Sequence, residues 1–165
     1  MNFWVVNIGL ALASVAVVKR DVIVETVKSI GQAPRGIRLN NPGNIEINSS
    51  NPWGGETVPS SDSRYAQFEH PVYGIRAIAR TLDTYRLRYG LTTIRQVITR
   101  WAPDHENDTE SYIQSASQRS GLSPNDDIRK NFPAFIAALI YHENGQQPYS
   151  LELIQAAIDM ATREL

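Results

Sequence analysis

Residues 135 to 145 read FIAALIYHENG and place a carboxylate, Glu143, at the end of an otherwise apolar segment. Glu143 lies three and four residues after two apolar positions, so on a helix it continues their face. Apolar neighbours and the negative end of a helix dipole both disfavour the anion of a carboxyl group. An acid that stays protonated near neutral pH can protonate the leaving oxygen of a glycosidic bond. The apolar residues of that face are Phe132, Phe135, Ile136, Leu139 and Ile140.

Other carboxylates compete for this role, and a glutamate simply exposed where the helix leaves the core would show the same spacing. Glu106, in DHENDTE, is the rival general acid. Asp104, Asn107, Asp108 and Glu110 lie around it, and negative charge is favoured in the first turn of a helix, so a capping or loop-ordering role is the commoner explanation. Glu46, Glu56 and Asp62 are candidates for a second carboxylate, acting as base or nucleophile. Exposed surface charge is the commoner explanation for each of these three.

Several polar and aromatic residues are candidates for binding a sugar. Asn44 lies in NNPGN, which is first of all a tight-turn sequence. Trp53, Tyr65 and Tyr141 could stack on sugar faces, whereas Trp101 lies on a helical stripe and is expected in the core. His70, His105 and His142 lack the spacing of metal ligands, so we predict no metal and no cofactor.

Mostly helices are expected to position these residues, because apolar residues recur at spacings of three and four after residue 71. Helices are expected over residues 72–89, from Thr92 or Thr93 to Trp101, from Asn107 or Asp108 to Gly121, from Ser123 onwards, from about Pro133 to Asn144, and after Ser150. Residues 35–71 are instead rich in turn formers, with short strand candidates at 44–47 and 64–68. The predicted fold is mainly α (α+β), a helical domain with a small β-hairpin lobe.

The chain divides into three predicted parts. Residues 3–18 carry no charge, so we expect residues 1–20 to be an N-terminal hydrophobic membrane anchor; a signal-peptide segment and a buried helix are the alternatives. Lys19 and Arg20 follow this run, and the positive-inside rule would keep them on the cytoplasmic side of the membrane. That orientation conflicts with export of the residues that follow. Residues 21–34 form a connector, and residues 35–165 form the globular domain.

The composition of the chain excludes some kinds of site and partner. The chain has 165 residues, which fits one domain, and no cysteine, which excludes disulfides and thiolate metal sites. Its formal net charge is −1. Because a basic surface is needed to hold nucleic-acid phosphates, we predict no nucleic-acid partner.

Four segments carry a family resemblance: RGIRLNNPGNIEINSSNPWGG (35–55), YAQFEHPVYGIRAIARTLDTYRLRYG (65–90), WAPDHENDTESY (101–112) and IYHENG (140–145). In this order they resemble a family of lysozyme-like proteins of bacteriophages and prophages, over roughly 130 residues. The resemblance implies cell-wall lysis or a wall-cutting role in the virion, although some members are described only as structural proteins. The order of the pieces is similar to a circularly permuted lysozyme-like fold, with the lobe first and the helix-terminal glutamate last.

We therefore predict an enzyme that cleaves the β-1,4 bond of peptidoglycan glycan strands, with Glu143 as general acid. It would be a muramidase, or a lytic transglycosylase if no second carboxylate is near. The alternative is a non-catalytic virion or membrane-associated protein that binds the wall. Peptidoglycan and the membrane are the expected partners, with other virion proteins as further candidates. The domain is expected to face the periplasm from its anchor, or to be carried in the virion.

Overall fold

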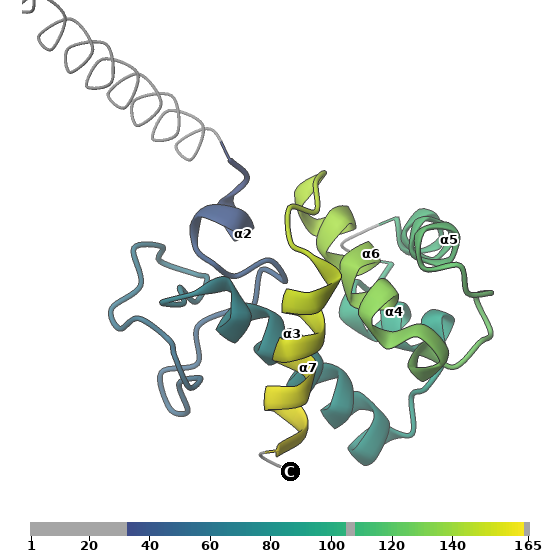
Figure 1. Ribbon diagram of the computed structural model, residues 1–165, viewed down its shortest axis with the longest axis horizontal. Helices are drawn as coiled ribbons and strands as arrows, with labels where there is room; N and C mark the ends of the chain where they lie inside the picture. Colours follow the sequence, from purple (N-terminus) through teal and green to yellow (C-terminus); the bar gives the residue numbers. More distant parts are fainter. Residues whose placement is uncertain (1–32, 105–107, 164–165) are drawn as a thin grey trace, which may run out of the picture. The chain divides into compact units, whose positions relative to one another are not determined.

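Helices make up most of the chain that the computed structural model describes, which comprises residues 33–104 and 108–163. Figure 1 shows them packed around one another, with a region of loops beside them. The prediction of a mainly α fold is confirmed. The elements are α2 (Arg35–Arg38), α3 (Pro71–Tyr89), α4 (Ile94–Trp101), α5 (Thr109–Ser120), the 3₁₀ helix η1 (Ile128–Asn131), α6 (Phe132–Asn144) and α7 (Leu151–Arg163).

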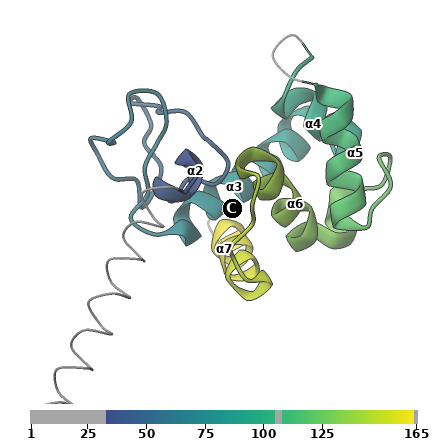
Figure 2. The ribbon, with the colours of Figure 1, turned by 90° about the horizontal axis from the view of Figure 1, so that it is seen from above.

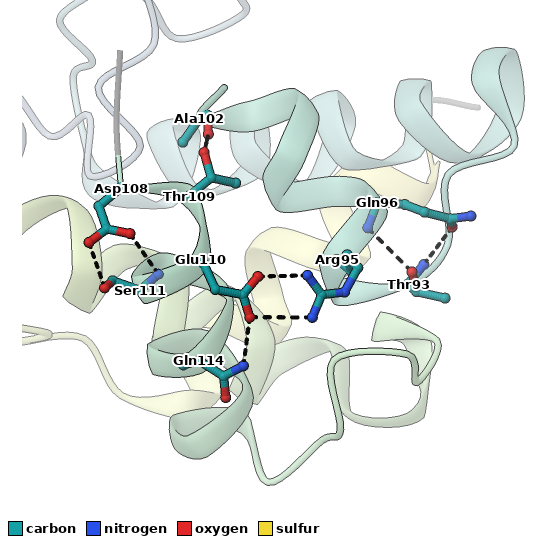
Figure 3. A network of polar contacts seen from close by, with 9 residues as sticks. All are labelled: Thr93, Arg95, Gln96, Ala102, Asp108, Thr109, Glu110, Ser111 and Gln114. Carbon is teal, nitrogen blue, oxygen red and sulfur yellow. Dashed lines mark hydrogen bonds and ion pairs between the residues drawn. The ribbon is translucent and has the colours of Figure 1, made fainter. Parts of the chain in front are cut away.

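Local sequence signals set the ends of these helices. Thr93 caps α4 in a capping box with Gln96, as Figure 3 shows. The side chain of Asp108 accepts the Ser111 N–H at the start of α5. Helices α3 and α5 end at glycines in the left-handed conformation, Gly90 and Gly121. The predicted end of α3, the predicted start of α4 and both predicted ends of α5 are therefore correct.

One predicted helix is wrong. The stretch from Ser123 begins with turns, and only residues 128–131 are helical, as η1. Two aspartates explain the difference, because their side chains bind backbone N–H groups locally. Asp126 accepts from the Ser123 N–H at 2.8 Å, and Asp127 accepts from the Arg129 N–H at 2.7 Å. Such contacts favour turns over a continuous helix.

The core lies between the helices. Helix α7 packs along α3, and α5 packs along α6, while α4 lies against α5. Figure 2 shows α4, α5 and α6 together on one side of this body. The apolar face predicted for α6 is fully inside, since Phe132, Phe135, Ile136, Leu139 and Ile140 are all buried. Burial of such apolar side chains throughout the core is the dominant favourable contribution to folding.

Residues 39–70 form what we call the loop lobe, and the predicted β-hairpin is not found there. Within the described residues the lobe contains no regular strand, only isolated antiparallel bridges between Glu46 and Tyr65 and between Glu56 and Phe68. Two backbone hydrogen bonds join residues 45–47 to residues 64–66, and the buried side chain of Asn41 adds further bonds between these segments. Its Nδ2 donates to the Ile45 carbonyl at 2.9 Å and to the Ala66 carbonyl at 2.7 Å.

The loop lobe is fixed to α3 by a small apolar cluster. Phe68 and Ala66 of the lobe are buried against Ala77 of α3, and Trp53 and Tyr73 pack around them. Within the lobe, Asn40 and Asn44 both adopt positive φ angles, of 52° and 48°. Asparagine tolerates this left-handed conformation better than most residues, which explains the turns of NNPGN.

The predicted membrane anchor and most of the connector fall on residues 1–32, which lie outside the described residues. No helix within residues 33–104 and 108–163 has the length and apolar character needed to cross a bilayer.

Candidate active site

Both carboxyl oxygens of Glu143 accept hydrogen bonds from side chains far away in the sequence. Oε1 accepts from the indole Nε1 of Trp101 at 2.9 Å and from the hydroxyl of Tyr112 at 2.9 Å. Oε2 accepts from Nδ2 of Asn44 at 3.1 Å. All three donors are neutral groups. Glu143 itself is half-buried, so the carboxyl is held in place while part of it meets solvent.

These contacts join four segments at one point. Asn44 comes from the loop lobe, Trp101 from the last residue of α4, Tyr112 from α5, and Glu143 from the last turn of α6. The lobe and the end of α6 therefore meet at Glu143. A side chain fixed by three neighbours in this way keeps one orientation, which is what a catalytic group needs.

Tyr112 is the most buried of the three donors, with 2% of its surface exposed. Burial, together with the neighbouring Glu143 carboxyl, raises the pKa of the Tyr112 phenol well above its ordinary value. The hydroxyl therefore remains a donor over the whole physiological pH range. The ring of Tyr112 also stacks on His142, with centroids 3.5 Å apart and planes inclined by 12°.

The end of α6 is fixed by the residues that follow Glu143. Gly145 takes the left-handed conformation, with φ 68°, and its N–H binds the Tyr141 carbonyl to end the helix. Asn144 is buried, and its Nδ2 donates to the Pro42 carbonyl at 2.8 Å and to the Ile140 carbonyl at 2.9 Å. Two successive residues, Glu143 and Asn144, therefore bind the loop lobe.

Gly36 of α2 lies against this junction. A Cβ atom at position 36 would be 2.5 Å from Oδ1 of Asn144, 2.9 Å from the Asn41 carbonyl and 3.0 Å from Oδ1 of Asn44. Both amide oxygens are buried and have no hydrogen-bond donor among the described residues. Only glycine leaves room for the two asparagines, so α2 sets how closely the lobe approaches the end of α6.

The other predicted sugar-binding residues lie elsewhere. Trp53 is half-buried in the lobe's apolar cluster. The Tyr65 ring faces the guanidinium of Arg35, 3.8 Å from the ring centroid. The Tyr141 ring faces Arg119 at 3.2 Å, and it lies two residues from Glu143, a spacing that points to another side of the helix. Asn44 is the one predicted binding residue with a direct contact to Glu143.

The three lobe carboxylates each have local partners. Glu46 forms an exposed ion pair with Arg64, and Glu56 accepts the Trp53 N–H at 2.8 Å. Asp62 accepts the N–H groups of Arg64 and Tyr65, and these bonds lower the pKa of its carboxyl. Among the described residues, none of the three has a hydrogen bond to Glu143 or to the donors around it.

Two predictions concern residues 105–107, which lie outside the described ranges. They are the rival acid, Glu106, and one of the histidines, His105. In residues 33–104 and 108–163, no three histidine, aspartate or glutamate side chains gather in a way that could hold a metal ion.

The loop lobe also contains an open cavity of about 360 Å³. Its walls include the apolar side chains of Ile47 and Val58 and the carboxylates of Glu56 and Asp62. Glu143 and its three donors are not among the residues that line it, so this cavity and the Glu143 site are separate features.

Sequence reasoning missed part of the site. Trp101 is expected in the core from its helical stripe, and Tyr112 is no predicted site residue; both do pack on the core, but each also directs one polar atom at Glu143. Tyrosine and tryptophan usually bond their polar atom when buried, and this is the signal that could have marked them. Asn144 carried a weaker signal, a polar residue directly before the helix-ending glycine.

Comparison with known proteins gives one informative relative. No protein-family model matches the chain. It is 42% identical to "Protein P5" of Pseudoalteromonas phage PM2 over 133 residues, which cover 79% of this chain and 83% of the relative. Identity at this level over most of both chains shows common descent and a shared fold. The chain belongs to the family of protein P5 of Pseudoalteromonas phage PM2.

Proposed function

We propose that the protein cleaves the β-1,4 glycosidic bond of peptidoglycan, with Glu143 as the general acid. The observation that carries this proposal is the fixed, half-buried Glu143 carboxyl between Asn44, Trp101 and Tyr112. A general acid must hold its proton at a defined place relative to the leaving oxygen. Three donors from separate segments provide such positioning, and a glutamate with only a surface role has no need of them.

The hydrogen bonds also indicate where the proton would be carried. A carboxylate offers about four lone-pair positions on its two oxygens. Trp101 and Tyr112 occupy both positions on Oε1, and Asn44 occupies one on Oε2. The remaining position is on Oε2. We infer that Oε2 carries the proton that is given to the glycosidic oxygen.

The lobe carboxylates favour chemistry with a single acid. Glu46, Glu56 and Asp62 are engaged with neighbours in the lobe, and in the described part of the chain none is hydrogen-bonded to Glu143 or to its donors. In a lytic transglycosylase, Glu143 would protonate the leaving oxygen of the cleaved bond. The C6 hydroxyl of the N-acetylmuramic acid would then attack its own C1 and give its proton to the Glu143 carboxylate. The product is a 1,6-anhydro sugar, and no water is consumed.

Two kinds of variant test this proposal. In Glu143→Gln the side-chain shape is kept but no proton can be given, so lysis of purified cell walls should fall by roughly 10²- to 10⁴-fold. The fold should be retained, because the Asn44 amide can turn and accept from the new amide through its Oδ1, which has no donor now. Undiminished lysis by this variant, seen in a zymogram or turbidity assay, would exclude Glu143 as the acid.

The control variants are Glu46→Gln, Glu56→Gln and Asp62→Asn, each of which removes one lobe carboxylate. If one acid suffices, all three should retain lysis, and mass spectrometry of the products should show 1,6-anhydro ends. Loss of lysis in one of them, with products heavier by one water, would instead indicate hydrolysis with that residue as the second carboxylate.

A second candidate function is a non-catalytic protein that binds the wall, in the virion or at a membrane. It is favoured by the three protein donors that already bind both carboxyl oxygens of Glu143, as in a purely structural cluster. In that case the wild-type protein would bind purified peptidoglycan and release no soluble fragments.

A further inference from the structure

Aromatic rings and one arginine form a continuous strip that leads away from Glu143. It begins at Trp101, whose indole N–H binds Glu143. The ring of Tyr85 meets the Trp101 ring edge-on, with centroids 6.5 Å apart. The Arg100 guanidinium lies 5.1 Å from the Tyr85 ring centroid and 3.9 Å from that of Tyr89. We call these four residues the α3–α4 strip.

The strip lies in a strongly basic part of the chain. Residues 84–103 contain four arginines and no aspartate or glutamate, although the whole chain has a net charge of −1. Arg95 is paired with Glu110, at 2.7 Å (Figure 3). Arg86, Arg88 and Arg100 are exposed, and none has a carboxylate partner among the described residues. Their positive charge is therefore not neutralised within the described part of the protein.

The end of α3 exposes flat and apolar surface together with this charge. Tyr89 is 52% exposed and Leu87 is 64% exposed. Arg86 precedes Tyr89 by three residues and Arg88 follows Tyr85 by three, so each arginine neighbours a ring on the helix surface. Tyr85 and Trp101 are half-buried and continue this surface to the Glu143 site.

We propose that the α3–α4 strip binds the anionic glycan strand of peptidoglycan on one side of the bond that is cleaved. Aromatic rings present flat faces to sugar rings, and guanidinium groups bind carboxylates through charge-assisted hydrogen bonds. A glycan strand that bears peptides offers both kinds of group in alternation. The strip would hold the strand so that it enters the site at Trp101 and reaches Glu143. This inference rests on the proposed function, because it assigns the substrate of that site.

The test measures binding without turnover, in the full chain carrying Glu143→Gln. Binding to purified cell-wall sacculi is measured by co-sedimentation, with and without a further Arg100→Gln or Tyr89→Ala change. Each change should weaken binding roughly tenfold, the effect of losing one charge-assisted contact or one ring contact. Arg95→Gln is the matched control, since Arg95 lies on the same helix but is paired with Glu110. It should leave the affinity unchanged.

The nature of the ligand is tested with sacculi whose carboxylates have been converted to neutral amides. The protein should bind them more weakly, and Arg100→Gln should then have little further effect. Equal affinities for Arg100→Gln and Arg95→Gln would overturn the proposal. It would also be overturned if the same changes weakened binding to anionic lipid vesicles or DNA and left binding to sacculi intact. If the wild-type protein releases no wall fragments but the strip variants still bind sacculi more weakly, the proposed catalysis is wrong. The proposed role of the strip in binding the glycan strand is then still supported.

Discussion

The hydroxyl of Tyr112 lies 2.9 Å from Oε1 of Glu143, although 31 residues separate the two in the sequence. Tyr112 is buried and its phenol stays protonated, so it is a permanent donor to this oxygen. The same ring carries His142 on its face. Tyr112 thus connects α5 to two successive residues at the end of α6, and its hydroxyl is the part that acts on Glu143.

The first prediction separates that hydroxyl from the ring. Tyr112→Phe keeps the stacking on His142 but removes the donor, so we expect a loss of about 1 to 2 kcal/mol in the free energy of unfolding. Wall lysis should fall roughly tenfold or more, because Glu143 is less well oriented. Urea denaturation and a turbidity assay measure the two effects. Tyr73→Phe is the control, since no hydrogen bond of the Tyr73 hydroxyl is found among the described residues.

Gly36 provides the second prediction. In Gly36→Ala the new methyl group would lie 2.5 Å from Oδ1 of Asn144 and 3.0 Å from Oδ1 of Asn44, so both side chains must shift. We expect a loss of roughly 1 to 3 kcal/mol in stability and a loss of wall lysis. Gly121→Ala is the comparison. Position 121 has open space and a φ of 71°, so alanine there should cost about 1 kcal/mol and spare lysis. Equal lysis by the two variants would contradict a role for Gly36 at the site.

The third prediction concerns two ion pairs that differ in burial. Asp83 of α3 is 5% exposed and pairs with Arg129 of η1. Asp83→Ala would leave the guanidinium partly buried without a partner, so we expect a loss of about 3 to 5 kcal/mol. Glu110→Ala removes the exposed pair with Arg95 and should cost much less stability, because solvent screens that pair. Thermal unfolding of both variants shows which substitution destabilises the protein more. A loss of stability in Glu110→Ala as large as that in Asp83→Ala would refute the reasoning.

The helix ends could be predicted from sequence because they depend on neighbouring residues. The glycines at 90, 121 and 145, the cap residues Thr93 and Asp108, and the apolar face of α6 all act within one or two turns. The contacts of Glu143 could not be predicted in this way, because its three donors lie 99, 42 and 31 residues away in the sequence. The lobe was misjudged for a related reason. Its turns follow from the sequence, but the segments that were expected to pair as strands share two backbone bonds, and the side chain of Asn41, from outside the pair, binds the Ile45 and Ala66 carbonyls between them.

The last prediction follows from His142. His142 is exposed but stacks one face of its ring on Tyr112, and partial desolvation lowers the pKa of its imidazole, an effect that outweighs the neighbouring Glu143 charge, which acts in the opposite direction. The pKa in the folded protein is therefore below the ordinary value of 6.5, which is close to that of the unfolded chain. At a pH between the two values the unfolded state binds more protons than the folded state, so folding stability rises with pH across this window and falls as the pH drops below about 6.5.

Replacing the imidazole tests this linkage directly. His142→Phe retains a flat ring against Tyr112 but cannot take up a proton. Thermal unfolding between pH 5 and 8 should give wild-type and variant melting temperatures whose difference becomes constant only about one pH unit above 6.5, where the unfolded imidazole is almost fully neutral. Below that pH the wild type should lose stability faster than the variant. Carboxylates that do not interact with His142 affect both proteins alike and cancel in this difference. Parallel curves over the whole range would show that His142 is equally easy to protonate in the folded and unfolded states.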